Sequence, residues 1–196
     1  MVIPDGQECP SYTSWTWLCP EDSPELRMTH ETRLKQVLTE IDTARRYALD
    51  ILSHIGDEDW FRMPAGNTTH VAWQVGHLAV AQYNLALRRM RGTHPDDEEL
   101  IPTTFRELFG KGSAPTDDER AYPAVAGLRR VLDAVHTAVL SENAELPDAV
   151  LDETAEPAHP MFRDKLGALR WTAQHEFIHV GQIALLRRIF GGDPLR

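Results

Sequence analysis

The sequence predicts an all-α protein: a four-helix bundle with a long connection between its second and third helices and an irregular N-terminal extension. Three observations support this prediction. Four segments repeat apolar residues at three- and four-residue steps, which is typical of helices with one buried face. Prolines and glycines gather between these segments. No stretch shows the sustained alternation of apolar and polar residues that a sheet requires.

The first two predicted helices lie between residues 28 and 91. The first spans about 28–54, with Gly56 as its stop. Its apolar stripe consists of Leu34, Leu38, Ile41, Ala48, Ile51, Leu52 and Ile55. The second helix spans about 69–91 and ends in arginines and Gly92, which suit the negative end of the helix dipole and a left-handed cap.

The last two predicted helices follow a long acidic connection. Residues 92–121 carry several glycines and prolines, and their segment "TTFRELF" suggests one or two helical turns. The third helix spans about 123–143, and the fourth about 165–190, with a proline-rich loop between them. A connection as long as 92–121 allows a crossover and often has a function of its own.

Residues 1–27 form a predicted extension that precedes a bundle domain at 28–196. The extension holds four prolines and the aromatic run "YTSWTWL", so we expect its tryptophans to pack on the bundle. Both cysteines, Cys9 and Cys19, lie in it. Their spacing does not match a zinc knuckle, which favours free thiols over a metal site.

The composition excludes several classes of partner. The formal net charge is −10, which disfavours binding to nucleic acid and to anionic membranes. No apolar run approaches the roughly 18–20 residues that span a bilayer. The N-terminus lacks a basic segment followed by an apolar one, so we expect a cytoplasmic location.

The fourth helix contains "HEFIH", a match to the HExxH signature of zinc peptidases. His175 and His179 are separated by about 40° and ~6 Å along a helix, so both can bind one ion. Peptidases of this kind need a third ligand downstream. The extended motif has a glycine and a histidine at the positions of Gln182 and Leu185, and none of the 17 residues after His179 is glutamate. The sequence therefore disfavours a peptidase.

His77 offers a third imidazole from the second helix. It lies in "AWQVGHLAVA", among apolar residues. Alone, it would be read as a core histidine, and His175 and His179 could equally be core residues hydrogen-bonded to backbone or water. Taken together, the three histidines predict a metal site inside the bundle.

The segments "WQVGHLAVAQ" and "QHEFIHVGQIALLRR" resemble the DinB/YfiT-like family of metalloenzymes. The resemblance covers about 28–190 and leaves the first 27 residues without a counterpart. It implies a four-helix bundle that binds a divalent metal through one histidine of the second helix and two of the fourth. By position these ligands are His77, His175 and His179. The resemblance also makes a homodimer plausible.

Three neutral imidazoles leave a coordination position open, as in catalytic metal sites. Zn²⁺ is the expected ion, and Ni²⁺, Fe²⁺, Co²⁺ and Mn²⁺ also accept such ligands. The resemblance implies a low-molecular-weight thiol as nucleophile, since related proteins include thiol-dependent transferases and isomerases. Water is the alternative nucleophile, with Glu176 as its base. The other reading of Glu176 is a carboxylate facing solvent or a dimer partner.

Other residues are weaker candidates for the site. Gln182 could hydrogen-bond a ligand histidine or serve only in helix packing. Trp73 shares the side of the helix that carries His77. Tyr47 and His136 could line the pocket or belong to the core and its boundary. The predicted function is a metal-dependent transferase or hydrolase of a small molecule; the competing class is a non-catalytic, metal-stabilised stress or interaction scaffold.

Overall fold

The computed structural model describes residues 30–66 and 68–193. The predicted extension at 1–27, with Cys9 and Cys19, lies outside these residues. Four long helical segments dominate the described part: α1 (His30–Ser53), α2 (Val71–Tyr83), α6 (Val125–Asn143) and α8 (Lys165–Ile189). The bounds of α1, α6 and α8 agree with those of the predicted helices to within a few residues.

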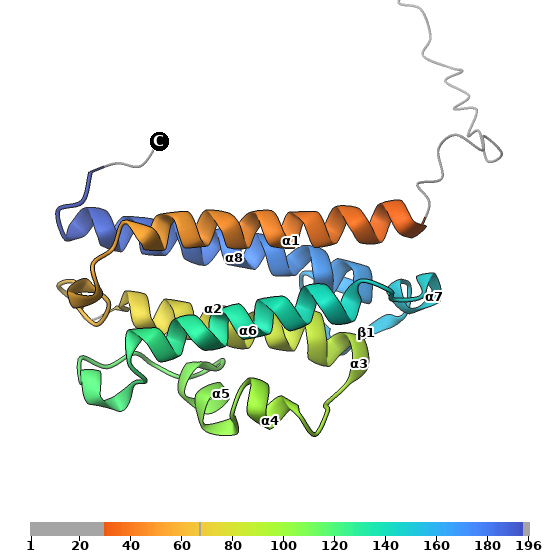
Figure 1. Ribbon diagram of the computed structural model, residues 1–196, viewed down its shortest axis with the longest axis horizontal. Coiled ribbons are helices and arrows are strands. Elements are labelled where there is room, and N and C mark those ends of the chain that lie inside the picture. Colours follow the sequence, from red (N-terminus) through yellow and green to blue (C-terminus); the bar gives the residue numbers. More distant parts are fainter. Residues whose placement is uncertain (1–29, 67, 194–196) are drawn as a thin grey trace, which may run out of the picture.

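The four helices form a bundle in which α1 runs along α8 and α2 runs along α6 (Figure 1). One buried apolar cluster joins them. In α1 the buried positions recur every three or four residues, as in Ile41, Ala44 and Ala48, none of which has any exposed surface. The predicted all-α bundle is confirmed.

The second helix is not uniform. After Tyr83 it passes through a π-helical segment, Asn84–Arg88, and continues as α3 (Arg89–Arg91). It ends at Gly92, whose φ of 81° lies in the region that glycine adopts most readily, as predicted. Helix α1 ends at Ser53, three residues before the predicted stop, Gly56, whose φ of −65° shows that it is not a left-handed cap.

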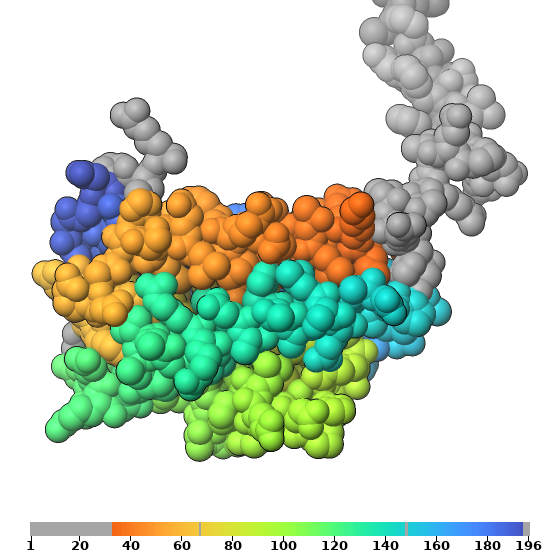
Figure 2. All heavy atoms as spheres, viewed as in Figure 1, coloured from red at the N-terminus to blue at the C-terminus, as the bar shows by residue number. Residues whose placement is uncertain are grey.

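The long connection packs along one edge of the bundle (Figures 1 and 2). It contains α4 (Asp97–Leu100), α5 (Thr103–Phe109) and a 3-10 turn at Glu119–Ala121; α5 corresponds to "TTFRELF". The fully buried Phe109 lies directly on α2, where a Cβ added to Gly76 would sit 2.4 Å from its ring. The glycine therefore brings α5 close to the helix that carries His77.

A small hairpin precedes α8, where the sequence predicts only a loop. It follows the short α7 (Asp148–Leu151) and pairs β1 (Thr154–His159) antiparallel with β2 (Phe162–Asp164). No helix of residues 30–66 and 68–193 is long and apolar enough to cross a membrane.

Candidate metal centre

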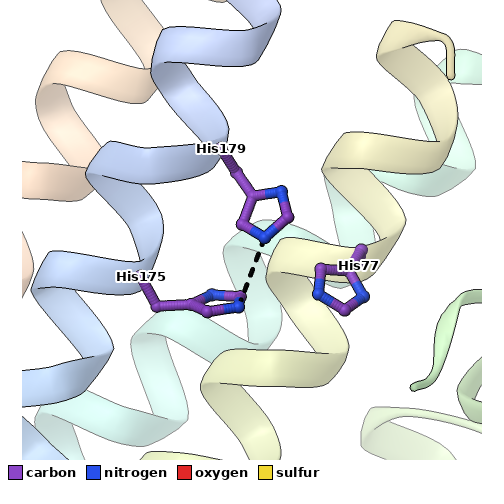
Figure 3. Close-up of side chains that lie close together, drawn as sticks. All are labelled: His77, His175 and His179. Carbon is purple, nitrogen blue, oxygen red and sulfur yellow. Dashed lines mark hydrogen bonds between the residues drawn. The ribbon is translucent and has the colours of Figure 1, made fainter. Parts of the chain in front are cut away.

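The three predicted histidines converge between two helices. His77 projects from α2, and His175 and His179 project from α8 toward it (Figure 3). One ring nitrogen from each lies within 4.8 Å of the other two, and the Nε2 atoms of His175 and His179 are 3.2 Å apart. Ligand nitrogens bound to zinc at about 2.0–2.1 Å in a tetrahedral site lie about 3.3 Å apart. The pair on α8 therefore has the spacing that such an ion needs.

A backbone carbonyl fixes the tautomer of His77. Its Nδ1 lies 2.8 Å from the carbonyl oxygen of Phe109, which can only accept a hydrogen bond. Nδ1 therefore carries the proton, and Nε2 keeps a lone pair for a metal. The ring of Trp73 stacks on His77 at 4.9 Å with an interplanar angle of 7°. The connection at 92–121 thus supplies, through α5, the group that orients a ligand on α2.

His179 is oriented by Gln74, which is not among the site residues predicted from the sequence. The Gln74 amide nitrogen donates to Gln182 Oε1 at 2.8 Å and to Thr69 Oγ1 at 3.0 Å. Its carbonyl oxygen is therefore left to accept the Nδ1 proton of His179. The predicted contact of Gln182 with a ligand histidine is thus indirect, because Gln74 lies between them.

Burial keeps the imidazoles neutral. It lowers the pKa of His175 to about 4 and that of His179 to about 3, and the charge that each neighbouring histidine would carry adds to the effect. Burial also lowers the pKa of His77, against the opposing effect of its bond to Phe109. Near neutral pH all three rings are unprotonated, which is the form that coordinates a metal.

Two of the three histidines, His77 and His175, border a cavity of about 800 Å³. His77 and His175 are part of its wall, together with Trp171 and residues of the β1–β2 hairpin such as Pro157. Three imidazoles with one open side toward a cavity are a donor set that suits a divalent transition metal. The site can therefore receive a small molecule next to such an ion.

Comparison with protein-family models finds a match to the DinB superfamily over residues 40–183. The chain belongs to the DinB superfamily. The matched range includes all three histidines and confirms the resemblance that the two motifs indicated. No curated protein matches the chain.

Glu176 of this DinB protein lies buried inside the bundle. Its side chain is only 2% exposed and pairs with Arg45 of α1, whose Nε donates to Oε1 at 2.6 Å and whose Nη2 donates to Oε2 at 3.4 Å. Arg45 also donates to the Leu132 carbonyl at 2.8 Å and to Gln82 at 2.9 Å. Both carboxylate oxygens are committed to Arg45, which gives no support to a base role. The alternative of a solvent-facing carboxylate is wrong.

The two remaining candidates lie outside the cavity wall of the DinB domain. Tyr47 is 48% exposed and packs against Phe177 on the outer surface of α1 and α8. His136 lies 3.1 Å from Gln82 and 3.3 Å from Asp42, at the edge of the network around Arg45. Of the residues proposed as pocket or supporting groups, Trp73 and Gln182 are therefore the ones near the histidines.

Proposed function

We propose that His77, His175 and His179 hold one divalent transition metal ion and that the protein is an enzyme acting on a small molecule. One observation carries this proposal: three neutral imidazoles, two of them with their Nδ1 atoms already bonded to protein, converge beside a cavity that His77 and His175 line. Zn²⁺ suits three nitrogen ligands best, and Ni²⁺, Fe²⁺, Co²⁺ and Mn²⁺ are further candidates.

A metal at this position would lower the pKa of a coordinated thiol or water and so supply a nucleophile near neutral pH. A thiol is the better supported nucleophile. A free thiol has a pKa of about 8.5 and needs little help to ionise, whereas water needs far more and commonly a base as well. Glu176, the base expected from the HExxH pattern, is held by Arg45 instead. We therefore propose that a low-molecular-weight thiol attacks an electrophilic substrate.

The residues around the histidines have their own parts in this proposal. Gln74 and the Phe109 carbonyl hold the ligand rings in place. Trp73 covers one face of His77, and Trp171 contributes an apolar wall beside His175. A scaffold would have no use for an open cavity beside the ligands, so the cavity favours an enzyme.

Metal analysis tests the first half of the proposal. Elemental mass spectrometry of protein purified without a histidine tag should find about one transition metal ion per chain. The variants His77→Ala, His175→Ala and His179→Ala should each lose it. His54→Ala, which removes a half-exposed histidine just after α1, should retain it. Full retention in any of the three variants would remove that residue from the ligand set. Absence of metal even after reconstitution would contradict the site.

An activity screen tests the second half. Metal-loaded protein would be incubated with low-molecular-weight thiols and the electrophile monochlorobimane, and adduct formation followed by fluorescence. We expect turnover that is lost in His175→Ala and kept in His54→Ala. Hydrolysis of ester substrates without any thiol dependence would instead favour water as the nucleophile, and cleavage of casein would revive the peptidase.

A further inference from the structure

The wall of the cavity next to the histidines carries three cationic side chains. Arg88 and Arg89 come from the end of the second helix, and Lys111 comes from the connection that follows α5. Within residues 30–66 and 68–193, none of the three forms an ion pair with a carboxylate. Glu156 is the one acidic residue of the wall in the described chain. The cavity is therefore positively charged.

Three cations around one cavity contrast with the overall charge of the protein, which has 30 acidic and 20 basic residues. Several arginines elsewhere in the bundle have acidic partners, whereas others, such as Arg129 and Arg187, form no ion pair within the described residues. Arg45 pairs with Glu176 at 2.6 Å, Arg91 with Asp97 at 2.7 Å, and Arg106 with Glu98 at 3.1 Å. The three cations of the cavity therefore have no carboxylate partner within residues 30–66 and 68–193, although carboxylates are numerous in the chain.

The π-helical segment contributes to this arrangement. Arg89 follows His77 by twelve residues, and an unbroken α-helix would turn it about 120° away from that histidine. In Asn84–Arg88 the hydrogen bonds span five residues instead of four, so the helix turns less at each residue and Arg89 comes round closer to the His77 face. Segments of this kind are frequent at functional sites.

Backbone and amide groups hold the two arginines without neutralising them. Arg88 donates to Asn84 Oδ1 at 3.4 Å, while Arg89 donates to the carbonyl oxygen of Asn84 at 3.4 Å and to that of Pro157 at 3.3 Å. The Nε of Arg89 is buried and has no hydrogen-bond partner in the described part of the chain. These hydrogen bonds are long and go to neutral groups, and the Phe162 ring lies 5.3 Å from the Arg89 guanidinium carbon. No anionic group among the described residues therefore neutralises this half-buried guanidinium.

The positive field acts on neighbouring groups. Burial lowers the pKa of Arg89, and the charge of Arg88 lowers it further. Burial also lowers the pKa of His159 across the cavity, and the charges of Arg89 and Lys111 add to this effect. An anion placed among these groups would relieve the repulsion that they now exert on one another.

We propose that the cavity binds an organic anion whose carboxylate lies at Arg88, Arg89 and Lys111 while its body extends past Trp171 toward the three histidines. A guanidinium matches a carboxylate in shape and charge. Val80, Leu85 and Trp171 supply the apolar part of the wall, and a cavity of about 800 Å³ admits a molecule of ordinary metabolite size. The proposal rests on the proposed enzyme function and names its substrate class.

The test compares an acid with its neutral counterpart. Phenylacetate and phenylacetamide have the same size and apolar body and differ in charge at one end. Each would be titrated into ¹⁵N-labelled full-length protein and its dissociation constant measured from amide chemical shifts. We expect phenylacetate to bind about tenfold more tightly, as charge-assisted hydrogen bonds would require. The preference should be lost in Arg88→Gln/Arg89→Gln and kept in Arg46→Gln/Arg120→Gln, which removes two exposed arginines elsewhere.

The same titrations in His175→Ala separate the two proposals. A carboxylate could bind a metal directly, but the preference in this variant should persist if the arginines are responsible. Equal binding of acid and amide, no saturable binding of either, or a preference that survives removal of both arginines would each overturn the anion site. The metal content of every sample is measured in parallel. A preference for the acid in wild-type protein that takes up no metal even after reconstitution would contradict the metal site while supporting the anion site.

Discussion

Replacing Glu176 by alanine should destabilise the protein rather than remove a catalytic base. The carboxylate and the Arg45 guanidinium are 2% and 1% exposed, and they meet at 2.6 Å in the middle of the bundle. In Glu176→Ala, Arg45 would keep only the Leu132 carbonyl and the Gln82 amide as acceptors. Removing one partner of a buried pair costs about 3–5 kcal/mol, because the other charge is left uncompensated.

A loss of this size is a large part of the roughly 5–15 kcal/mol that stabilises a typical domain. For a chain of this length it corresponds to a fall in Tm of about 6–20 °C. Urea and thermal unfolding followed by circular dichroism would measure it. The double variant Arg45→Met/Glu176→Leu should recover most of the loss, since an apolar pair of similar volume leaves no buried charge.

The conservative variant Glu176→Gln decides between the two roles. We expect Glu176→Gln to lower the free energy of unfolding. Turnover should then fall only as far as the fraction of folded protein falls. If Glu176→Gln instead had the unfolding curve and the metal content of the wild type but no turnover, Glu176 would be a base and our reasoning about Arg45 would be refuted. Wild-type stability in Glu176→Ala would refute it as well.

Three further predictions concern other parts of the bundle. Gln74→Leu should weaken metal binding about 10–100-fold in competition with a chelator, because His179 loses its orienting acceptor; unchanged affinity would rule this role out. Gly76→Ala should lower the free energy of unfolding in urea by about 1–3 kcal/mol, because the new Cβ would meet the Phe109 ring. An unfolding curve identical to that of the wild type would show that α5 can move away without cost. Burial raises the pKa of Asp97, but bonds led by that from Arg91 outweigh this and bring it to about 2, below its unfolded value of 3.8. The ionised carboxylate should therefore add about 1–2 kcal/mol to the free energy of unfolding above pH 4, and this contribution should disappear between pH 4 and 2. Asp97→Asn should flatten that part of the curve of unfolding free energy against pH. An unchanged curve would contradict the assignment.

The helices could be predicted from sequence because their buried faces repeat locally. The stripe of α1 and the four-residue spacing of His175 and His179 are properties of single helices. The hairpin could not be predicted in this way. Its strands are short, contain Pro157, and acquire their pairing only from the residues across the turn.

In the candidate site, too, features within one helix could be predicted, whereas contacts between distant parts of the sequence could not. The three histidines were accessible from spacing and resemblance, whereas the partners of Glu176 and His179 were not. Arg45 lies 131 residues from Glu176, and Gln74 lies 105 residues from His179. Gln74 had one local signal: it stands three residues before His77, so both belong to nearly the same face of α2. The predicted homodimer and cytoplasmic location stay predictions.

Helix α8 is fastened from two sides, by Arg45 of α1 through Glu176 and by Gln74 of α2 through His179. These attachments oppose rotation of the helix about its own axis, so the histidine pair faces His77 through protein contacts alone. An incoming ion then has no chain to order, in contrast to zinc fingers, which fold only when the metal arrives. The metal-free protein should therefore be a folded, cooperative species, and the ion should raise its unfolding temperature in proportion to the logarithm of its concentration.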